Sequence, residues 1–147
     1  MAQGSFSAKI SSWVKETRER RDAVYRGSAQ RIVAIMQTPR AEGGNLRVRD
    51  GFLRASLVAT TSGALPVQTF KPAEGVPYAY DAAAINLVIA GAEINEPITA
   101  VYTANYARPR EYGARGQAGD RWVALASQRW PQAVEQECAE ARARAGG

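Results

Sequence analysis

Apolar side chains recur at helical spacing along the start of the chain. Phe6, Ile10 and Trp13 lie three or four residues apart, and the same period resumes at Val24. This spacing places apolar side chains on one face of an α-helix and polar ones on the other. The pattern predicts one long helix over residues 5–37, the first half of which leaves Trp13 partly exposed for a partner.

The middle of the chain alternates short β-branched or aromatic runs with turn-forming residues. Runs of this kind, bounded by glycine, proline or asparagine, are typical of strands. The pattern predicts strands at 52–61 and 98–105. A further strand is predicted from Ile85, in a run whose periodicity alone fits helix or strand. The segment 63–77 is rich in proline and glycine and predicts an irregular loop with a short extended piece at 67–70.

The last part of the chain is again helical in its pattern. Residues 119–144 carry a broad apolar stripe, and Asp120 is placed to cap the first turn. Pro131 lacks a backbone donor, so it should kink the helix or restart it. The predicted fold class is α+β, with a small, mostly antiparallel sheet covered by a long N-terminal helix and a C-terminal helix. Residues 1–147 are predicted to form a single domain.

Length and composition are ordinary for one globular domain. The chain has 147 residues, of which 46% are hydrophobic. The longest apolar run, 82–92, is interrupted by Asn86 and falls short of the roughly 20 residues that span a membrane. The first residues contain no secretory signal pattern. We therefore expect a soluble protein with no membrane partner.

The inventory of reactive side chains lowers the expectation of catalysis. The chain has no histidine and one cysteine, Cys138. This excludes an internal disulfide, a cysteine-cluster metal site and every Ser-His or Cys-His nucleophile pair. The run Gly43–Gly51 has the glycines of a phosphate loop but lacks the lysine and hydroxyl residue that complete one. We expect no catalytic, cofactor-binding or metal-binding residues, and a protein that is not an enzyme.

Basic residues outnumber acidic ones. The formal net charge is +5, and seven basic against three acidic side chains lie between Lys9 and Arg31. Such an excess is a feature of nucleic-acid-binding surfaces, because it attracts phosphates. Acidic side chains share this segment, and no aromatic residue stands among the arginines at 18–21. A solvated or subunit-facing helix is therefore the preferred interpretation, and a basic nucleic-acid-binding module is the alternative.

The segment Asn105–Gly113, which reads NYARPREYG, is the least like a core element. It places two aromatic residues, two arginines, a glutamate and a glycine in nine residues. Aromatic and arginine side chains are enriched in protein–protein interfaces, so the segment predicts the edge of a subunit interface. Glu111 then has a plain role as an ion-pair partner rather than a catalytic one. Its candidate partners are Arg108, Arg110 and Arg115.

Three segments, taken in order, resemble a known family. Residues 50–60, DGFLRASLVAT, are similar to the Thr-Gly-x-Leu-Arg-x-Ser pattern that follows the first long helix in neck proteins of long-tailed bacteriophages. NYARPREYG resembles the Tyr-Ala…Glu-x-Gly pattern that this family carries after its central strands. The closing RWVALASQRWPQAVEQ is similar to its C-terminal helix. Order and spacing agree over most of the chain, from about Phe6 to Arg144.

Most of the key positions of the two patterns are matched. The matched residues are Gly51, Leu53, Arg54, Ser56, Tyr106, Ala107, Glu111 and Gly113. Asp50 stands where the family often has threonine, which changes any turn that depends on a hydroxyl group. Pro131 is unusual for the last helix, and residues 63–77 have no clear match.

The resemblance implies a structural virion protein of the head–tail connector, of the tail-completion type. Several copies would form a ring that joins the tail to the head, and the near alternative is the tail terminator that caps the tube. Expected partners are other copies, other neck proteins, the tail tube or terminator, and DNA in the ring lumen. The expected location is the virion neck, after assembly in the bacterial cytoplasm. The interface is predicted to include Trp13, Arg47, Arg49, Arg54, Tyr106, Arg108, Arg110, Glu111 and Tyr112.

Overall fold

The computed structural model describes residues 2–70 and 77–146 of the chain. Its elements in chain order are α1 (Ala2–Met36), the 3-10 helix η1 (Arg40–Glu42), α2 (Phe52–Ala55), β1 (Leu57–Thr60), α3 (Ala82–Ala90), β2 (Thr99–Tyr102), α4 (Ala107–Tyr112), β3 (Gly113–Ala114), β4 (Gln117–Ala118), α5 (Trp122–Ser127) and α6 (Trp130–Arg144). The long N-terminal helix, the C-terminal helix and the small antiparallel sheet confirm the predicted α+β class. Among the described helices, none combines the length and the apolar character needed to cross a membrane.

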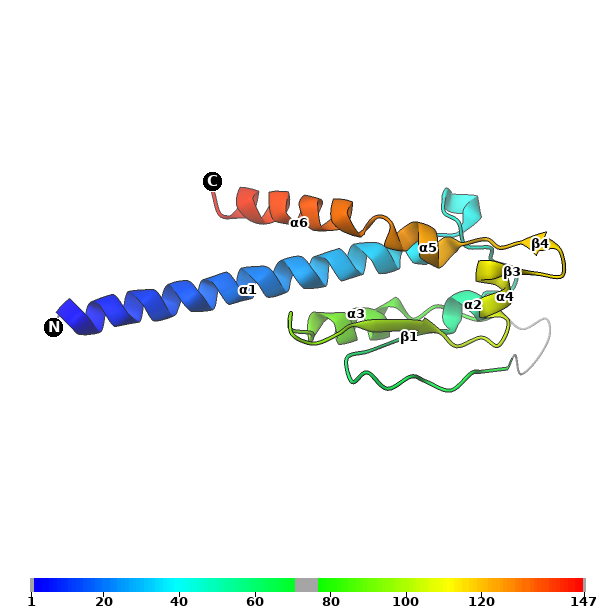
Figure 1. Cartoon of the computed structure of the whole chain (residues 1–147), viewed down its shortest axis with the longest axis horizontal. Coiled ribbons are helices and arrows are strands. Elements are labelled where there is room, and N and C mark those ends of the chain that lie inside the picture. Colours follow the sequence, from blue (N-terminus) through cyan, green and yellow to red (C-terminus); the bar gives the residue numbers. More distant parts are fainter. Residues whose placement is uncertain (1, 71–76, 147) are drawn as a thin grey trace.

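α1 is one continuous helix of 35 residues, which at 1.5 Å per residue is about 52 Å long. The predicted helix over 5–37 is thus confirmed. α6 runs beside the C-terminal half of α1, whereas the N-terminal half extends past the other described elements (Figure 1). The side chains from Phe6 to Trp13 are exposed. The C-terminal half of α1 therefore packs against the rest of the fold, and its N-terminal part projects from it.

A glycine and an ion-pair cluster join α1 to α6. A Cβ atom on Gly27 would collide with the Glu137 carboxyl group, so the absence of a side chain lets α6 approach closely. Arg31 Nε donates to Glu137 Oε1 at 2.7 Å, and Arg31 Nη2 donates to Glu140 Oε1 at 2.5 Å. Hydrogen bonds to Glu137 and Glu140 raise the pKa of Arg31. The two helices are thus held together by charge at a point where they touch.

β1 and β2 pair antiparallel over their whole lengths. Leu57 and Ala59 are buried and Val58 is exposed, which is the alternation of a strand with one face on the core. The strand predicted at 98–105 is confirmed over Thr99–Tyr102. The strand predicted at 52–61 is right for its second half only.

α2 replaces the first half of that predicted strand. Asp50 Oδ1 accepts a hydrogen bond from Phe52 N at 3.1 Å and so closes a local turn. A threonine hydroxyl can accept the same kind of hydrogen bond from the backbone two residues on. Gly51 adopts a left-handed φ of 87°, and a Cβ there would collide with the Tyr78 carbonyl oxygen. Phe52 and Leu53 are consecutive and both buried, which a helical turn permits and strand alternation does not.

α3 overturns the strand predicted from Ile85. Asp81 accepts a hydrogen bond from Ala84 N at 3.1 Å and so caps the helix. Alanine, the best helix former, occupies the first turn at 82–84. Ile85 and Ile89 lie one turn apart and are buried. The cap and the alanines therefore outweigh the strand preference of the β-branched residues that follow.

The predicted C-terminal helix consists of two helices. α5 ends at Ser127, and α6 begins at Trp130 with Pro131 in its first turn. Proline is tolerated at this place because first-turn amides have no acceptor within the helix. The restart predicted at Pro131 is confirmed.

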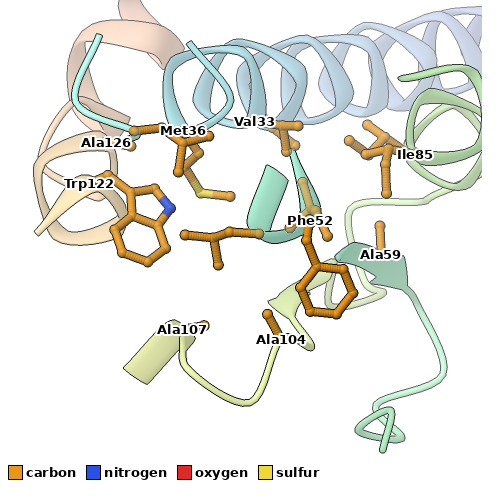
Figure 2. Close-up of a cluster of buried hydrophobic side chains, with 14 residues drawn as sticks. Val33, Met36, Phe52, Ala59, Ile85, Ala104, Ala107, Trp122 and Ala126 are labelled. Atoms are coloured by element: carbon orange, nitrogen blue, oxygen red, sulfur yellow. The ribbon is translucent and has the colours of Figure 1, made fainter. Parts of the chain in front are cut away.

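One core joins these elements, as Figure 2 shows. Trp122 of α5 is 2% exposed, and its ring meets the ring of Tyr102 in β2 edge-on at 5.3 Å. The labelled core residues, from the helices, β1 and the segment that follows β2, are Val33, Met36, Phe52, Ala59, Ile85, Ala104, Ala107, Trp122 and Ala126. The core thus ties the C-terminal half of α1 to the sheet and to α5.

Residues 61–70 form no helix or strand, in agreement with the predicted irregular loop. Thr69 N donates to Thr103 O at 2.7 Å, so the extended piece predicted at 67–70 lies beside the end of β2. The part of the predicted loop at 71–76 lies outside the described residues.

Candidate functional site

The two segments that carry the family resemblance meet in space. α2 and α4 lie together at one end of the sheet (Figure 1). The ring of Phe52 lies 6.0 Å from the ring of Tyr106, and Thr103 N donates to Ser56 O at 3.0 Å. Residues far apart in the sequence therefore form one surface.

Between these segments lies a hollow of about 310 Å³, which we name the arginine cleft. Its lining residues are Arg47, Val48, Arg49, Asp50, Gly51, Leu53, Arg54, Tyr106 and Arg110. This lining brings together the predicted interface residues Arg47, Arg49, Arg54, Tyr106 and Arg110. The volume is at the small end of the range for ligand sites, about 300–1,000 Å³, and suits a few side chains.

Two contacts fix the position of Arg54. Its Nε donates to the carbonyl oxygen of Gln37 at 2.9 Å, and its guanidinium carbon lies 5.2 Å from the centre of the Tyr80 ring. The second contact is a cation–π interaction. Gln37 Nε2 also donates to Arg54 O at 2.9 Å, so the backbone and the side chain of Arg54 are both anchored. The positive charge of Arg54 is therefore held in place at the wall of the cleft.

Asp120 neutralises part of the charge beside the cleft. Its Oδ1 accepts a hydrogen bond from Arg40 Nη2 at 3.2 Å and forms an ion pair with Arg47 Nε at 3.0 Å. The prediction that Asp120 caps the C-terminal helix is wrong, because its carboxylate faces these arginines. Arg49 and Arg110, by contrast, form no ion pair with residues 2–70 and 77–146. Within the described part of the chain, these two cations of the cleft therefore have no carboxylate partner.

Glu111 of α4 supplies the cap that Asp120 does not. Its Oε2 accepts from Val123 N at 3.0 Å, and its Oε1 accepts from Ala124 N at 2.9 Å. These amides belong to the first turn of α5, where the helix leaves them without an acceptor and where its dipole favours a negative charge. Glu111 is buried. Its predicted ion pair with a neighbouring arginine is therefore wrong, and the residue fixes α5 against α4.

A second, wider cleft of about 950 Å³ adjoins the arginine cleft and shares three residues with it. Its lining residues are Arg47, Tyr106, Pro109, Arg110, Gly113, Ala114, Arg115, Gln117, Ala118 and Asp120. The β3–β4 hairpin forms one side of it. Arg115 and Gly116 make the hairpin turn with φ values of 51° and 77°, as a two-residue turn of the primed type requires. Arg115 therefore adds a further cation beside the cleft.

The remaining predicted interface residues lie elsewhere. Arg108 and Tyr112 belong to α4 but line neither cleft, and both are exposed, Tyr112 to 75%. Trp13 lies on α1 and is 66% exposed, which confirms its predicted exposure. The structure thus gathers the arginines and Tyr106 and leaves these three residues apart from them.

Trp13 belongs to an apolar stripe on the N-terminal arm, which we define as residues 6–17 of α1. Phe6 is 66% and Ile10 is 48% exposed, in addition to Trp13. Their spacing of four and three residues puts them on one face of the helix. In Figure 1 most of this part of α1 projects beyond the other described elements. A row of large apolar side chains in this position is a feature of binding surfaces.

Two exposed features were not predicted from the sequence. Leu65, Val67 and Phe70 are 74%, 85% and 72% exposed, although nothing in a proline-rich loop says which side chains stay outside. The turn Glu93–Glu96, between α3 and β2, exposes two carboxylates and Ile94. The strand predicted from Ile85 is in fact α3, so the predicted elements contain no helix that this turn could follow.

Comparison with known proteins adds no relative. No protein-family model, no curated protein and no solved structure matches this chain.

Proposed function

We propose that this protein is a structural component of the neck of a tailed bacteriophage, of the tail-completion type, and that its copies form a ring between tail and head. The observation that carries the proposal is the convergence of both resemblance segments on the arginine cleft. Gly51 and Arg54 from the first pattern and Tyr106 from the second line the same hollow. Patterns that described only local folding would not need to meet in this way.

The N-terminal arm also supports a role in assembly. Covering a large apolar side chain contributes roughly 1.5–3 kcal/mol, and the arm presents Phe6, Ile10 and Trp13 on one face. A neighbouring copy or another neck protein that covers this face would gain such contributions. In a ring of identical copies, one surface of each copy binds a different surface of the next copy, and the contacts close into a circle. The apolar face of the arm is suited to be one of these two surfaces.

The proposal assigns structural work and no reaction to the chain. Arginines and one aromatic residue, Tyr106, line the two clefts together with aliphatic residues, Asp50 and Asp120, and arginine and aromatic side chains are enriched at interfaces between proteins. On this proposal the protein resides in the virion neck, with the tail tube or terminator, other neck proteins and the DNA of the lumen as its neighbours.

Removal of the gene from the encoding phage tests the proposal. The expected lysate contains DNA-filled heads and complete but separate tails by electron microscopy, and a plasmid copy of the gene restores joined particles. A terminator would instead leave tails of abnormal length, which tells the two neck roles apart. Joined, infectious particles in the absence of the protein would refute the proposal.

A nucleic-acid-binding role is the second candidate function. It is favoured by the arginines around the adjoining clefts, which are Arg47, Arg49, Arg54, Arg110 and Arg115. Contacts with phosphates release counterions, so the logarithm of the binding constant should fall by about 0.9 per contact for each tenfold rise in salt. Fluorescence anisotropy with a short labelled duplex measures this slope. Absence of binding at low salt would remove this candidate.

A further inference from the structure

The turn between α3 and β2 is an exposed, acidic counterpart to the arginine cleft. We name residues 93–96 the acidic turn. The side chains of Glu93, Ile94 and Glu96 are all exposed, Ile94 to 39%. The turn therefore combines two exposed carboxylates with one aliphatic side chain, and Glu96 Oε2 also accepts from Glu93 N at 3.4 Å. Arg18 and Arg21 of α1 line the hollow beside the turn together with Asp22, so Glu93 and Glu96 are the anions that the turn itself offers to arginines of a partner.

Hydrogen bonds to α1 hold the acidic turn in one shape. Ile94 N donates to Asp22 Oδ1 at 2.9 Å, and Tyr25 Oη donates to Glu96 O at 2.7 Å. Within the turn, Glu96 N donates to Glu93 O at 2.9 Å. A turn held in this way loses little conformational entropy when it docks, so most of its contact energy remains available for binding.

The cleft has places for both kinds of side chain. Arg49 and Arg110 lack an acidic partner among the described residues, whereas the half-buried Arg31 elsewhere in the chain has two. Leu53 and Val48 contribute an apolar part of the lining, on which an aliphatic side chain can rest. Guanidinium groups bind carboxylates in a planar, paired geometry that adds direction to the attraction.

The acidic turn cannot reach the cleft of its own chain. The turn is bound to the middle of α1 at Asp22, and the cleft is bound just beyond the C-terminal end of α1, through Arg54 and the carbonyl of Gln37. Gln37 follows Asp22 by fifteen positions, all of them in α1 except Gln37 itself, which corresponds to about 22 Å along the helix axis. In Figure 1 the α3–β2 connection and the pair α2 and α4 lie at opposite ends of the sheet. Any pairing of turn and cleft therefore joins two molecules.

We propose that the acidic turn of one copy docks into the arginine cleft of the next copy. Glu93 and Glu96 then pair with Arg49 and Arg110, and Ile94 covers the apolar part of the lining. Because the two surfaces differ and lie at opposite ends, the contact is head-to-tail and each copy offers one free surface of each kind. Repetition of such a contact generates a ring when the rotation between copies closes. This inference rests on the proposed function only in taking the closed form to be the ring of a phage neck.

Exchanging the charges on the two surfaces tests the contact. One variant carries Arg49→Glu with Arg110→Glu, and the other carries Glu93→Arg with Glu96→Arg. Each variant alone should self-associate at least tenfold more weakly than the wild type in sedimentation velocity at low salt, because like charges face each other. An equimolar mixture should recover association, since the cleft of each variant then faces a turn of opposite charge.

A matched control separates the contact from a general effect of charge. The variant with Arg129→Glu and Arg142→Glu makes the same change of net charge as the variant with Arg49→Glu and Arg110→Glu, but on exposed residues of the α6 region. It should associate like the wild type. Circular dichroism should show the same helix content in all variants. A mixture that stays as weak as its components would overturn the proposal, and so would a wild-type protein that remains monomeric up to about 1 mM, where even weak specific contacts are occupied.

The outcome is independent of the test of the proposed function. If the gene deletion leaves heads and tails separate while the charge exchange fails, the neck role stands and this docking contact is wrong. If the charge exchange succeeds while the deletion leaves particles intact, the chain assembles head-to-tail for another purpose.

Discussion

Replacing Glu111 by glutamine tests whether α4 holds α5 through a carboxylate. In the folded protein both oxygens of Glu111 accept backbone hydrogen bonds, from Val123 N at 3.0 Å and from Ala124 N at 2.9 Å. The side chain is 7% exposed, so water cannot readily replace a lost acceptor. Glutamine keeps the size and one acceptor oxygen, but it turns an amide group toward a backbone N–H that also donates.

The size of the effect follows from these contacts. A hydrogen bond to a charged group contributes about 1.5–3 kcal/mol, and the interaction of a charge with a helix N-terminus adds about 0.3–1 kcal/mol. One bond is lost and the other becomes neutral, so we expect the free energy of unfolding to fall by about 2–3 kcal/mol. For a chain of this size that corresponds to a decrease in Tm of roughly 4–12 °C.

Urea unfolding followed by circular dichroism measures this difference. Glu135→Gln is the matched control, because it makes the same chemical change at an exposed position of α6. It should shift the free energy of unfolding by less than about 0.5 kcal/mol. Equal midpoints for the two variants would show that the buried carboxylate does not stabilise α5, and the reasoning about the cap would be refuted.

Three further predictions concern the cleft, the arm and the core. Gly51→Ala should lower the free energy of unfolding by at least about 2 kcal/mol in urea titration, because φ is 87° and the new Cβ meets the Tyr78 carbonyl; a neutral result would contradict this geometry. Trp13→Ser should change the free energy of unfolding by less than about 0.5 kcal/mol, because Trp13 is 66% exposed, yet it should reduce co-sedimentation with purified tails. Undiminished binding would show that the arm is not a contact with the tail. Burial raises the pKa of Tyr102, so the folded state keeps a proton that the unfolded state loses above about pH 10, and stability should decline there. Tyr102→Phe should flatten that decline in pH-dependent unfolding, while losing about 1 kcal/mol at neutral pH with its hydrogen bond to Gln37; an unchanged slope would count against the buried hydroxyl.

The elements with long or simple patterns were predictable from the sequence. The helix over 5–37 was predicted because its stripe runs for several turns, and β2 because its residues are β-branched or aromatic within turn signals. The error at Ile85 arose where a single run satisfied both periodicities. There the deciding features were the Asp81 cap and the alanines beside it, whose effect is local and smaller than a full pattern. The error at Phe52 arose because a short helical turn has too few residues to show a period.

The residue types of the site were easier to predict than their roles. Arg110 and Tyr106 are predicted because arginine and aromatic residues are enriched at interfaces, and Arg54 because it matches the family pattern; the fold brings the three to one cleft. The roles of Glu111 and Asp120 were missed for a common reason. Each was assigned a partner close in sequence, whereas Glu111 caps a helix that begins later in the chain and Asp120 pairs with arginines from before α2. Such contacts depend on tertiary arrangement, which local spacing does not encode.

The N-terminal arm gains its order from the same core that forms the cleft. An isolated helix of this length is marginal in water because its first turn is costly to nucleate. In this chain the C-terminal half of α1 is already fixed by Val33 and Met36 in the core. The ion pairs of Arg31 with Glu137 and Glu140 of α6 also hold it in place. Extension of that helix adds a backbone hydrogen bond for each residue without a new nucleus. The face with Phe6, Ile10 and Trp13 is therefore set out before a partner arrives, and docking on it needs less ordering than folding a free segment would.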